Sequence, residues 1–211
     1  GGSDISGALL AAASGSEVYE NWTDVPGVFR ADPAIVPGAR PIPRMTYDEV
    51  RELAYMGVSV LHEDAVTPVR RMGIPIHIRC TMDPAAPGTR ISSQRCASSC
   101  PITGIAGRRG YCSIQVEKER MNDAVGYCRR ILSVLEVHGV PFDHIATGLG
   151  SICFIVPTRT LSACRDALLA DIYRAVSPDG ICVADGLAMV SIVGRDMAGL
   201  PGVSGRLLGA L

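Results

Sequence analysis

The fold is decided by residues 17–33, EVYENWTDVPGVFRADP. Val, Tyr and Trp near the start of this segment are spaced as in a sheet, which predicts a strand over Glu17–Thr23. Polar Thr23 and Asp24 end this strand, and a Pro-Gly pair then favours a turn. In open α/β sheets, ligands bind just past the carboxyl ends of the strands. The segment is therefore predicted to be either such a ligand-binding edge or an ordinary exit from a strand into a turn.

The composition suits a globular chain with one large or two small domains. The chain has 211 residues, 47% of them hydrophobic, and a formal net charge of −1. Because the charge is balanced, no electrostatic attraction to nucleic acid or to an anionic membrane is expected. No apolar run reaches the roughly 18–20 residues of a membrane span, and no signal-peptide pattern opens the chain. We therefore expect a cytoplasmic protein with no nucleic-acid or membrane partner.

The eight cysteines indicate free thiols and not a metal site. No Cys-x-x-Cys pair is present, and no histidine lies at zinc-ligand spacing from a cysteine. Cys96 and Cys100 form the only near-pair, in a Ser-rich stretch where metal binding is the less favoured alternative. Thiols within apolar runs are typical of buried residues in a reducing cytosol. No metal ligand is assigned.

The first half of the chain alternates helices and strands. Residues 5–15, ISGALLAAASG, have a helical composition and stop at a glycine typical of a helix C-cap. Thr46–Glu49 has the form of a capping box, so a helix should follow it, and a second helix is predicted over Asp64–Met72. Isoleucines alternate with other residues over Ile74–Thr81, which predicts a half-buried strand with His77 facing solvent.

The second half has the element order βαββαβ of a ferredoxin-like unit. Apolar patterns predict strands over residues 111–116, 141–146, 151–156 and 183–193, and helices over residues 124–137 and 161–176. Val125 is expected on the apolar face of the first of these helices. A further helix is predicted over residues 203–211, and its Gly-rich start repeats an earlier pattern, so a second, truncated copy of the unit is expected.

Taken in order, several motifs resemble those of aspartate kinases of the amino-acid kinase superfamily. They are GGSD at 1–4, WTDVPGVFRADP at 22–33, TYDEVRELAYMG at 46–57, VLHEDAV at 60–66, DPAAPGT at 83–89 and ITGIAG at 102–107, followed by two ACT-like units. The resemblance covers the whole chain. It implies an α/β fold, namely the C-terminal half of an amino-acid kinase α/β sandwich followed by ferredoxin-like (α+β) ACT units.

The same resemblance implies four parts of the chain. Residues 1–95 would be the nucleotide-binding half of the kinase domain, residues 96–107 a linker and a strand joining the second ACT unit, residues 108–178 the first ACT domain, and residues 179–211 the truncated start of the second. The kinase half with the catalytic lysine is not among these residues, and the chain begins without Met. We therefore expect this chain to be inactive alone.

The implied activity is the ATP-dependent phosphorylation of the aspartate β-carboxylate, with ATP and Mg²⁺ as cofactors. Such a transfer depends mainly on positioning and charge neutralisation. By its place in the motif, Asp4 corresponds to the aspartate that orients the catalytic lysines, and Gly1, Gly2 and Ser3 to the loop beside the aspartate substrate. The implied nucleotide-binding residues are Thr23, Asp24, Phe29, Arg30, Asp32, Pro33 and Ser59.

Three positions near the implied nucleotide site depart from the family pattern. Phe29 replaces the usual tyrosine, Ala34 an arginine and Ser59 a lysine. Each lost cation removes a charge-assisted contact near the phosphates. Arg30 and Arg40 are the candidate substitutes.

The ACT units imply feedback by an end-product amino acid, lysine or threonine, and a homo-oligomer such as a dimer. The implied effector-binding residues are Met121, Asp123, Gly126, Phe142, Asp143 and Thr147. The turn before a helix suits an effector carboxylate, and Asp143 suits an ammonium group. Asp143 is alternatively a solvent-exposed strand charge, and Met121 a core residue. Gly148-Leu149 replaces a Ser-Glu pair that is frequent in the family.

Two other functions are considered. One is a non-catalytic amino-acid-sensing ACT module, since some aspartate kinases have a separate regulatory chain that resembles this region. A different amino-acid kinase, such as a glutamate kinase, is disfavoured because an ACT-like second half would not follow it. Titration with lysine, threonine and ATP separates the sensing module from the kinase.

Overall fold

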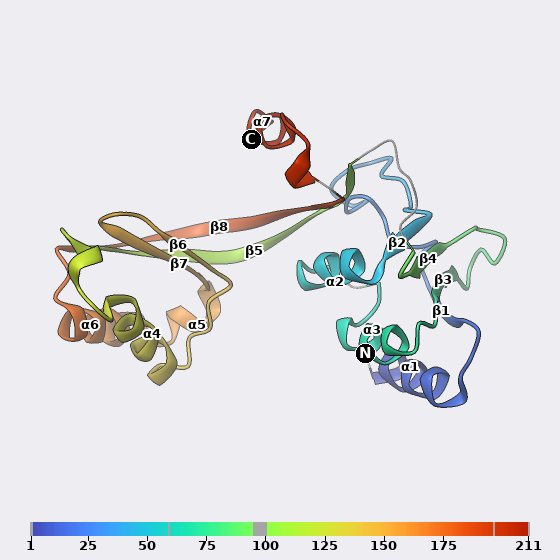
Figure 1. The fold of residues 1–211 in the computed structure, drawn as a ribbon, viewed down its shortest axis with the longest axis horizontal. Coiled ribbons are helices and arrows are strands. Elements are labelled where there is room, and N and C mark those ends of the chain that lie inside the picture. Colours follow the sequence, from blue (N-terminus) through green and yellow to red (C-terminus); the bar gives the residue numbers. More distant parts are fainter. Residues whose placement is uncertain (1, 59, 95–100, 196, 211) are drawn as a thin grey trace. The chain divides into compact units, whose positions relative to one another are not determined.

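The computed structural model describes residues 2–58, 60–94, 101–195 and 197–210. Contacts divide the chain into two units, one of Gly1–Gly107 with Val190–Leu211 and one of Arg108–Met189 (Figure 1). Gly1, Ser59 and the first part of the predicted linker, residues 96–100, lie outside the described residues. Each of the two sheets has four strands.

The first sheet is mixed and belongs to the first unit. Its strands are β1 (Tyr19–Thr23), β2 (Arg44–Thr46), β3 (Ile76–Cys80) and β4 (Thr89–Ser92), in the spatial order β1-β3-β4-β2. β1 is parallel to β3 and β2 to β4, whereas β3 and β4 are antiparallel. Because β3 lies inside the sheet, its isoleucines Ile76 and Ile78 are fully buried.

Three helices accompany this sheet: α1 (Gly2–Ser14), α2 (Tyr47–Tyr55) and α3 (Glu63–Arg71). α1 packs against both α3 and β1, as Figure 1 shows. The predicted capping box is present at the start of α2, where the side chains of Thr46 and Glu49 accept from each other's backbone N–H groups. α1 ends where predicted, at Ser14, and Gly15 follows with φ +64°.

The prediction that His77 faces solvent is wrong. The residue is 9% exposed, and its Nε2 lies 3.0 Å from the carbonyl oxygen of Pro87. The loop between β3 and β4 covers the ring, since a Cβ placed on Gly88 would lie 3.1 Å from Nε2. A strand inside a sheet can be covered on both faces, so the alternation of residue types did not report exposure here.

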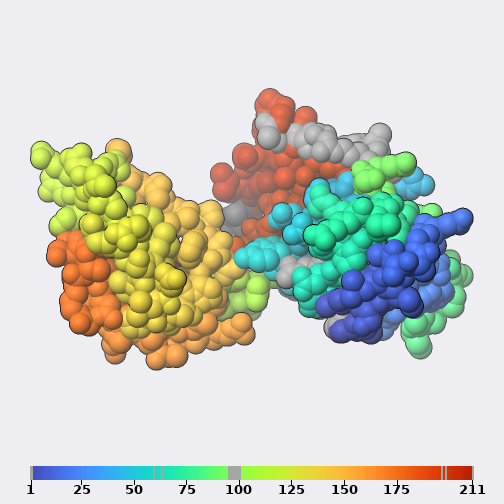
Figure 2. Space-filling view, turned by 60° about the horizontal axis from the view of Figure 1, so that its bottom comes forward, coloured from blue at the N-terminus to red at the C-terminus, as the bar shows by residue number. Residues whose placement is uncertain are grey.

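The second sheet carries the ferredoxin-like unit. Its strands are β5 (Ile102–Glu117), β6 (His144–Thr147), β7 (Ser151–Pro157) and β8 (Gly180–Gly194), in the order β6-β7-β5-β8. With the helices α4 (Tyr127–Val137) and α6 (Arg165–Val176), they give the predicted order βαββαβ. α4 and α6 pack against each other, and their yellow and orange surfaces adjoin in Figure 2.

An apolar core holds this unit together. Its buried members include Ile131 and Leu135 of α4, Leu168 and Ile172 of α6, and Ile114, Phe154 and Val156 of the sheet. Residues along β7 alternate between buried and partly exposed, as a sheet with helices on one face requires. Burial of each large apolar side chain contributes about 1.5–3 kcal/mol before the conformational entropy cost.

The second unit differs from the sequence expectation at three places. The helix predicted over residues 161–176 is two helices, α5 (Thr158–Ser162) and α6, separated where Cys164 leaves the helical conformation with φ −141°. Val125 is 92% exposed, because α4 begins only after Gly126, whose φ is +74°. β6 begins at His144, so residues 141–143 precede the strand.

The other described elements are short. They are the 3₁₀ turns η1 (Met121–Asp123) and η2 (Met197–Gly199) and the helix α7 (Val203–Leu208). The long strands β5 and β8 contribute to both units, with residues 102–107 and 190–194 assigned to the first. Within the described ranges, no helix has the length and apolar character needed to cross a membrane.

Candidate functional site

A cavity of about 480 Å³ lies beside the loop that follows β1. Phe29, Asp32 and Pro33, three of the predicted nucleotide-binding residues, line it together. The remaining lining residues are Val25, Ala31, Ile35, Val36, Met56, Gly57, Val58, Val60, Ile105, Ala106, Gly107 and Val190. Among the described residues that line this cavity, none is Lys or Arg and most are apolar.

The loop beside this cavity is held by a buried threonine of β4. Thr89 Oγ1 accepts from the backbone N–H of Val28 at 2.9 Å and donates to the carbonyl oxygen of Ile42 at 2.6 Å. Gly27 makes room for this contact, since its φ is +130° and a Cβ on it would lie 2.5 Å from Thr89 Oγ1. The loop is therefore ordered by contacts that the local sequence pattern does not reveal.

Three other predicted nucleotide-binding residues lie outside the cavity lining. At the end of β1, Thr23 Oγ1 donates to Asp24 Oδ1 at 3.1 Å, and Asp24 is exposed. Arg30 Nη1 donates to the carbonyl oxygen of Ile102 at 3.1 Å, and the Arg30 N–H donates to the Arg40 carbonyl oxygen at 3.0 Å. Arg30 thus joins the loop to β5, and its role at the phosphates stays a prediction.

Sequence reasoning did not find the part of this cavity that β5 and β8 supply. Ile105 and Val190 lie far from the loop in sequence and carry no local signal for ligand binding. Only the three-dimensional fold brings them to the same cavity as Phe29.

Asp4 lies in the first turn of α1, where the helix dipole favours a negative charge. Its Oδ1 accepts from Asn21 Nδ2 at 3.2 Å, and its Oδ2 accepts from the backbone N–H of His62 at 3.4 Å. The Tyr19 hydroxyl donates to the backbone carbonyl oxygen of Asp4 at 3.1 Å. Burial raises the pKa of Tyr19, the hydrogen bond from Asn21 lowers it, and the charge of Asp4 raises it again.

Two of the predicted substrate-binding residues, Gly2 and Ser3, are exposed immediately before Asp4. They begin α1, so their backbone N–H groups are among those that a helix leaves without an intrahelical partner. Their assignment to the aspartate substrate stays a prediction.

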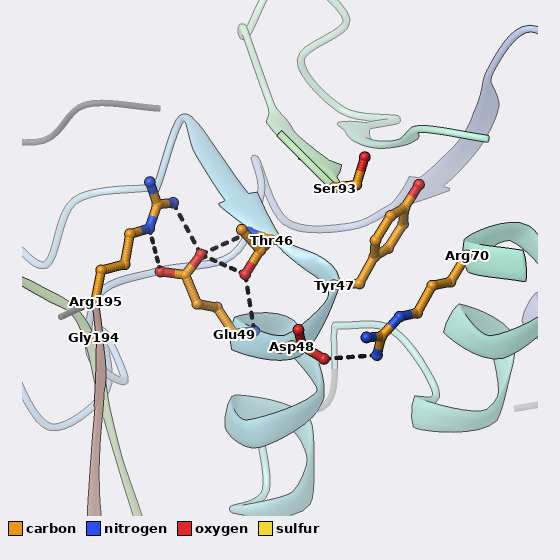
Figure 3. Close-up of a pocket in the computed structure, with 8 residues that line it drawn as sticks. All are labelled: Thr46, Tyr47, Asp48, Glu49, Arg70, Ser93, Gly194 and Arg195. Atoms are coloured by element: carbon orange, nitrogen blue, oxygen red, sulfur yellow. Dashed lines mark hydrogen bonds and ion pairs between the residues drawn. The ribbon is translucent and has the colours of Figure 1, made fainter. Parts of the chain in front are cut away.

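A second cavity, of about 490 Å³, lies at the start of α2 (Figure 3). Its lining residues are Thr46, Tyr47, Asp48, Glu49, Arg70, Ser93, Gly194 and Arg195. The Glu49 side chain, 7% exposed, accepts from Arg195 Nε at 2.6 Å and from Arg195 Nη2 at 2.9 Å. The Glu49 carboxylate also accepts a hydrogen bond of 2.6 Å from Thr103 Oγ1 and one of 2.6 Å from the backbone N–H of Thr46. In Figure 3 the Arg195 guanidinium and Thr46 approach the carboxylate from two sides.

These contacts keep Glu49 ionised. Burial by itself raises the pKa of this carboxyl, but hydrogen bonds from Arg195, Thr103 and Thr46 outweigh burial and lower the pKa to about 2. Sequence analysis gave Glu49 only its capping role, because Arg195 lies 146 residues away. Both charges of the pair are satisfied within the protein, so this cavity is assigned no ligand.

A third cavity, of about 400 Å³, lies in the second unit. It is lined by Met121, Asn122, Ala124, Val125, Gly126, Tyr127, Cys128, Arg129, Thr147, Gly148 and Ile152, which include three of the predicted effector-binding residues. α4 begins at Tyr127, so unbonded backbone N–H groups and Arg129 both favour an anionic group here. The Tyr127 hydroxyl is buried and has no hydrogen-bond partner within the described part of the chain.

The other predicted effector-binding residues lie elsewhere. Asp123 is exposed in η1 and does not line the cavity. Phe142 packs edge-to-face on Phe154, with ring centroids 6.1 Å apart. Asp143 is close to Tyr111, whose pKa is raised first by burial and then by the charge of Asp143. The effector roles of these residues stay predictions.

Comparison with known proteins gives consistent relatives. The profile of the amino acid kinase family matches residues 1–80. Aspartokinase 3 of Bacillus subtilis is 37% identical over 211 residues, which cover 100% of this chain and 46% of that protein. The crystal structure of Clostridium acetobutylicum aspartate kinase superposes with a TM-score of 0.95 at 41% identity, covering 100% of this chain and 49% of that one.

Two solved states of Escherichia coli aspartokinase III are also similar. The complex with aspartate and ADP (R-state) has a TM-score of 0.79, and the complex with lysine and aspartate (T-state) a TM-score of 0.76, both at 29% identity. They cover 99% and 100% of this chain and 47% of theirs. The chain thus spans about half the length of the relatives that it matches. Because this similarity runs through both units, the chain belongs to the aspartate kinase family of the amino acid kinase superfamily.

Proposed function

We propose that this chain is part of an aspartate kinase that transfers the γ-phosphoryl group of ATP to aspartate. An oxygen of the β-carboxylate attacks the γ-phosphorus, ADP leaves, and 4-phospho-aspartate is the product, at the first step of the lysine, threonine and methionine branch. The observation that carries the proposal is similarity over nearly the whole chain to an aspartokinase solved with aspartate and ADP. The position of a cavity at the predicted nucleotide edge supports it.

The 480 Å³ cavity suits the base and ribose of ATP better than its phosphates. Its wall is mostly apolar, and the described lining residues supply no cation for a triphosphate. Phe29 offers an aromatic face to the purine, and Asp24, next to the lining residue Val25, can accept from ribose hydroxyls. Cations for the phosphates therefore come from residues outside this lining.

The carboxylates beside this cavity fit a magnesium ion that arrives with ATP. Mg²⁺ in kinases is usually held by one or two carboxylates together with phosphate oxygens and water. Asp24 and Asp32 are both exposed, so both can reach a solvated ion. Bound with ATP, the ion supplies charge neutralisation at the phosphates.

Within the first unit, Asp4 orients a cationic side chain toward the reacting groups. Its carboxylate is already held at both oxygens, by Asn21 and by the backbone of His62. Gly1, Gly2 and Ser3 bind the aspartate substrate. Of these, Gly2 and Ser3 begin α1, and the N-terminal end of a helix favours anionic groups.

The second unit binds an end-product amino acid, lysine or threonine, in the 400 Å³ cavity. The N-terminal end of α4 and Arg129 would take the effector carboxylate, and Thr147 would add a hydroxyl. Support comes from the relative solved with lysine, Escherichia coli aspartokinase III. β6 and β8 are the edges of the sheet, so pairing at an edge would give the proposed homo-oligomer in the cytoplasm.

An ADP-release assay on the full-length product of the gene that encodes this chain tests the kinase. We expect release that depends on aspartate and that falls about 100-fold or more in Asp4→Asn, with Asp48→Asn, an exposed carboxylate of α2, as the matched control. If no aspartate-dependent release occurs while lysine or threonine still binds in calorimetry, the kinase proposal is overturned in favour of a non-catalytic sensing module.

A further inference from the structure

We propose that Asn21 and Tyr19 are positioning residues that hold the carboxylate of Asp4 in the orientation needed for phosphoryl transfer. The inference rests on the proposed kinase function, in which Asp4 orients a cationic side chain. It adds two residues of β1 that lie before the segment assigned to the nucleotide.

The two side chains form a closed hydrogen-bond ring with Asp4. Asn21 Nδ2 donates to Asp4 Oδ1 at 3.2 Å and to the Tyr19 hydroxyl oxygen at 3.1 Å. The Tyr19 hydroxyl in turn donates to the backbone carbonyl oxygen of Asp4 at 3.1 Å. The ring therefore fixes both the side chain and the backbone of Asp4.

Burial makes this ring rigid. Asn21 is 9% exposed and Tyr19 is 8% exposed, so water competes little for their hydrogen bonds. Residues two apart on a strand face the same side, and here that side faces α1, which packs on β1. The polar groups of both side chains are thus directed at the helix that carries Asp4.

The second carboxylate oxygen of Asp4 is held from a different element. Oδ2 accepts from the N–H of His62, the N-cap of α3, at 3.4 Å. With one oxygen held from β1 and the other from α3, the two contacts restrict rotation of the carboxylate. The rate of catalysis is sensitive to small displacements of the catalytic groups, since a misplacement of about 1 Å can lower the rate about 100-fold.

Tyr19 also sets the distance between β1 and the helix that carries Asp4. A Cβ placed on Gly7 would lie 2.9 Å from the Tyr19 hydroxyl oxygen and 3.0 Å from its ring. α1 thus rests directly on the tyrosine, one turn after Asp4. Loss of the tyrosine hydroxyl removes a bond to Asp4 while the ring still supports the helix.

The test measures kcat and KM of the full-length protein after Asn21→Leu and Tyr19→Phe. We expect kcat to fall by about 10- to 100-fold for Asn21→Leu, and by less for Tyr19→Phe, while KM for ATP and for aspartate changes by less than about threefold. The decisive step repeats Asn21→Leu in an Asp4→Asn background. There the substitution should change kcat by less than about twofold, because the group through which it acts is already removed.

Tyr47→Phe is the matched control for Tyr19→Phe. Tyr47 is 3% exposed, and its hydroxyl donates to the carbonyl oxygen of Ile74 at 2.7 Å, so this variant also loses one buried hydroxyl bond. Both variants should lower the melting temperature, but only Tyr19→Phe should lower kcat. If Asn21→Leu fails to fold, the test rests on Tyr19→Phe, because phenylalanine keeps the aromatic ring that supports α1 and loses only the hydroxyl.

Two results would overturn the inference. One is an equal loss of kcat for Asn21→Leu in the wild-type and in the Asp4→Asn background, which would mean that Asn21 acts independently of Asp4. The other is a Tyr19→Phe variant whose kcat matches that of Tyr47→Phe. A wild-type protein without aspartate-dependent ADP release would instead overturn the proposed function itself.

Discussion

At the scale of single residues, Glu49 makes the stability of the first unit depend on pH. Its pKa is lowered from 4.5 to about 2 in the folded protein. Because the folded pKa lies below the unfolded value, the contribution of Glu49 is fully present above about pH 4.5 and is lost as the pH falls toward 2. The responsible partners come from the N-cap of α2, from β5 and from the residue that follows β8.

Glu49→Gln tests this dependence. The lowered pKa corresponds to about 3 kcal/mol at neutral pH, so the variant should lose about that much unfolding free energy at pH 7. Urea unfolding between pH 7 and pH 3 should show a steep loss for the wild type and a flatter curve for the variant.

Asp48→Asn is the control for this experiment. Asp48 is the neighbouring acid, and its ion pair with Arg70 joins side chains that are 70% and 42% exposed, so its loss should cost less than about 1 kcal/mol. Similar losses in the Glu49 and Asp48 variants would show that the buried contacts of Glu49 add no stability.

At the scale of the elements, the start of α4 shapes the third cavity, which is the proposed effector site. Gly126 has φ +74°, and α4 begins immediately after it. The predicted strand and helix order of this unit was correct, because apolar periodicity is a local property of the sequence. The inward position of Val125 was predicted wrongly, because the helix begins three residues later than its apolar pattern does.

Gly126→Val should weaken effector binding about tenfold or more, because a β-branched residue resists the left-handed conformation that shapes this turn. Calorimetric titration of the full-length protein with lysine and with threonine measures the change. Gly139→Val is the matched control, since Gly139 has φ +63° just after the far end of the same helix and a Cβ placed on it would lie in open space. The two variants should lose similar stability, and equal effector affinity in both would contradict the assignment of this cavity.

At the scale of the whole molecule, β5 and β8 connect the two proposed binding functions. Ile105 and Val190 of these strands line the 480 Å³ cavity, and the same strands continue through the sheet of the second unit. An effector that changes the affinity for ATP must have its own affinity changed by ATP by the same factor.

We expect this reciprocal change to be about 5- to 150-fold, the usual range for coupled sites. Calorimetry in both orders, effector before nucleotide and nucleotide before effector, measures it in the full-length protein. Gly126→Val should keep the effector-free affinity for ATP. Affinities that are the same in both orders and unaffected by the second ligand would mean that the strands do not couple the sites.

Much of the fold could be predicted from local sequence signals, whereas the residues that line the cavities could be predicted only in part. Capping residues, helix-ending glycines and apolar periodicity are read within a few neighbouring residues, so α1, α2 and the βαββαβ order were predictable. Phe29, Asp32 and Pro33 were predicted together because they share one loop, and they line one cavity, while their binding of a nucleotide stays a prediction. The partners of Asp4 and Glu49 come from other elements, and Arg195 and Asn21 carry no local pattern that marks them.

The contacts around Glu49 have a consequence for the architecture of the chain. The Arg195 N–H donates to the carbonyl oxygen of Pro101 at 2.8 Å, and a Cβ on Gly194 would lie 2.2 Å from that oxygen. The chain therefore leaves the first unit and returns to it at adjacent points, so the second unit is an insertion within the first. Because the entropic cost of closing a loop grows slowly with its length, the inserted unit can be lengthened, exchanged or lost with little effect on the stability of the first unit. The same junction would let other inserted units, with other proposed ligands, be carried by one and the same first unit.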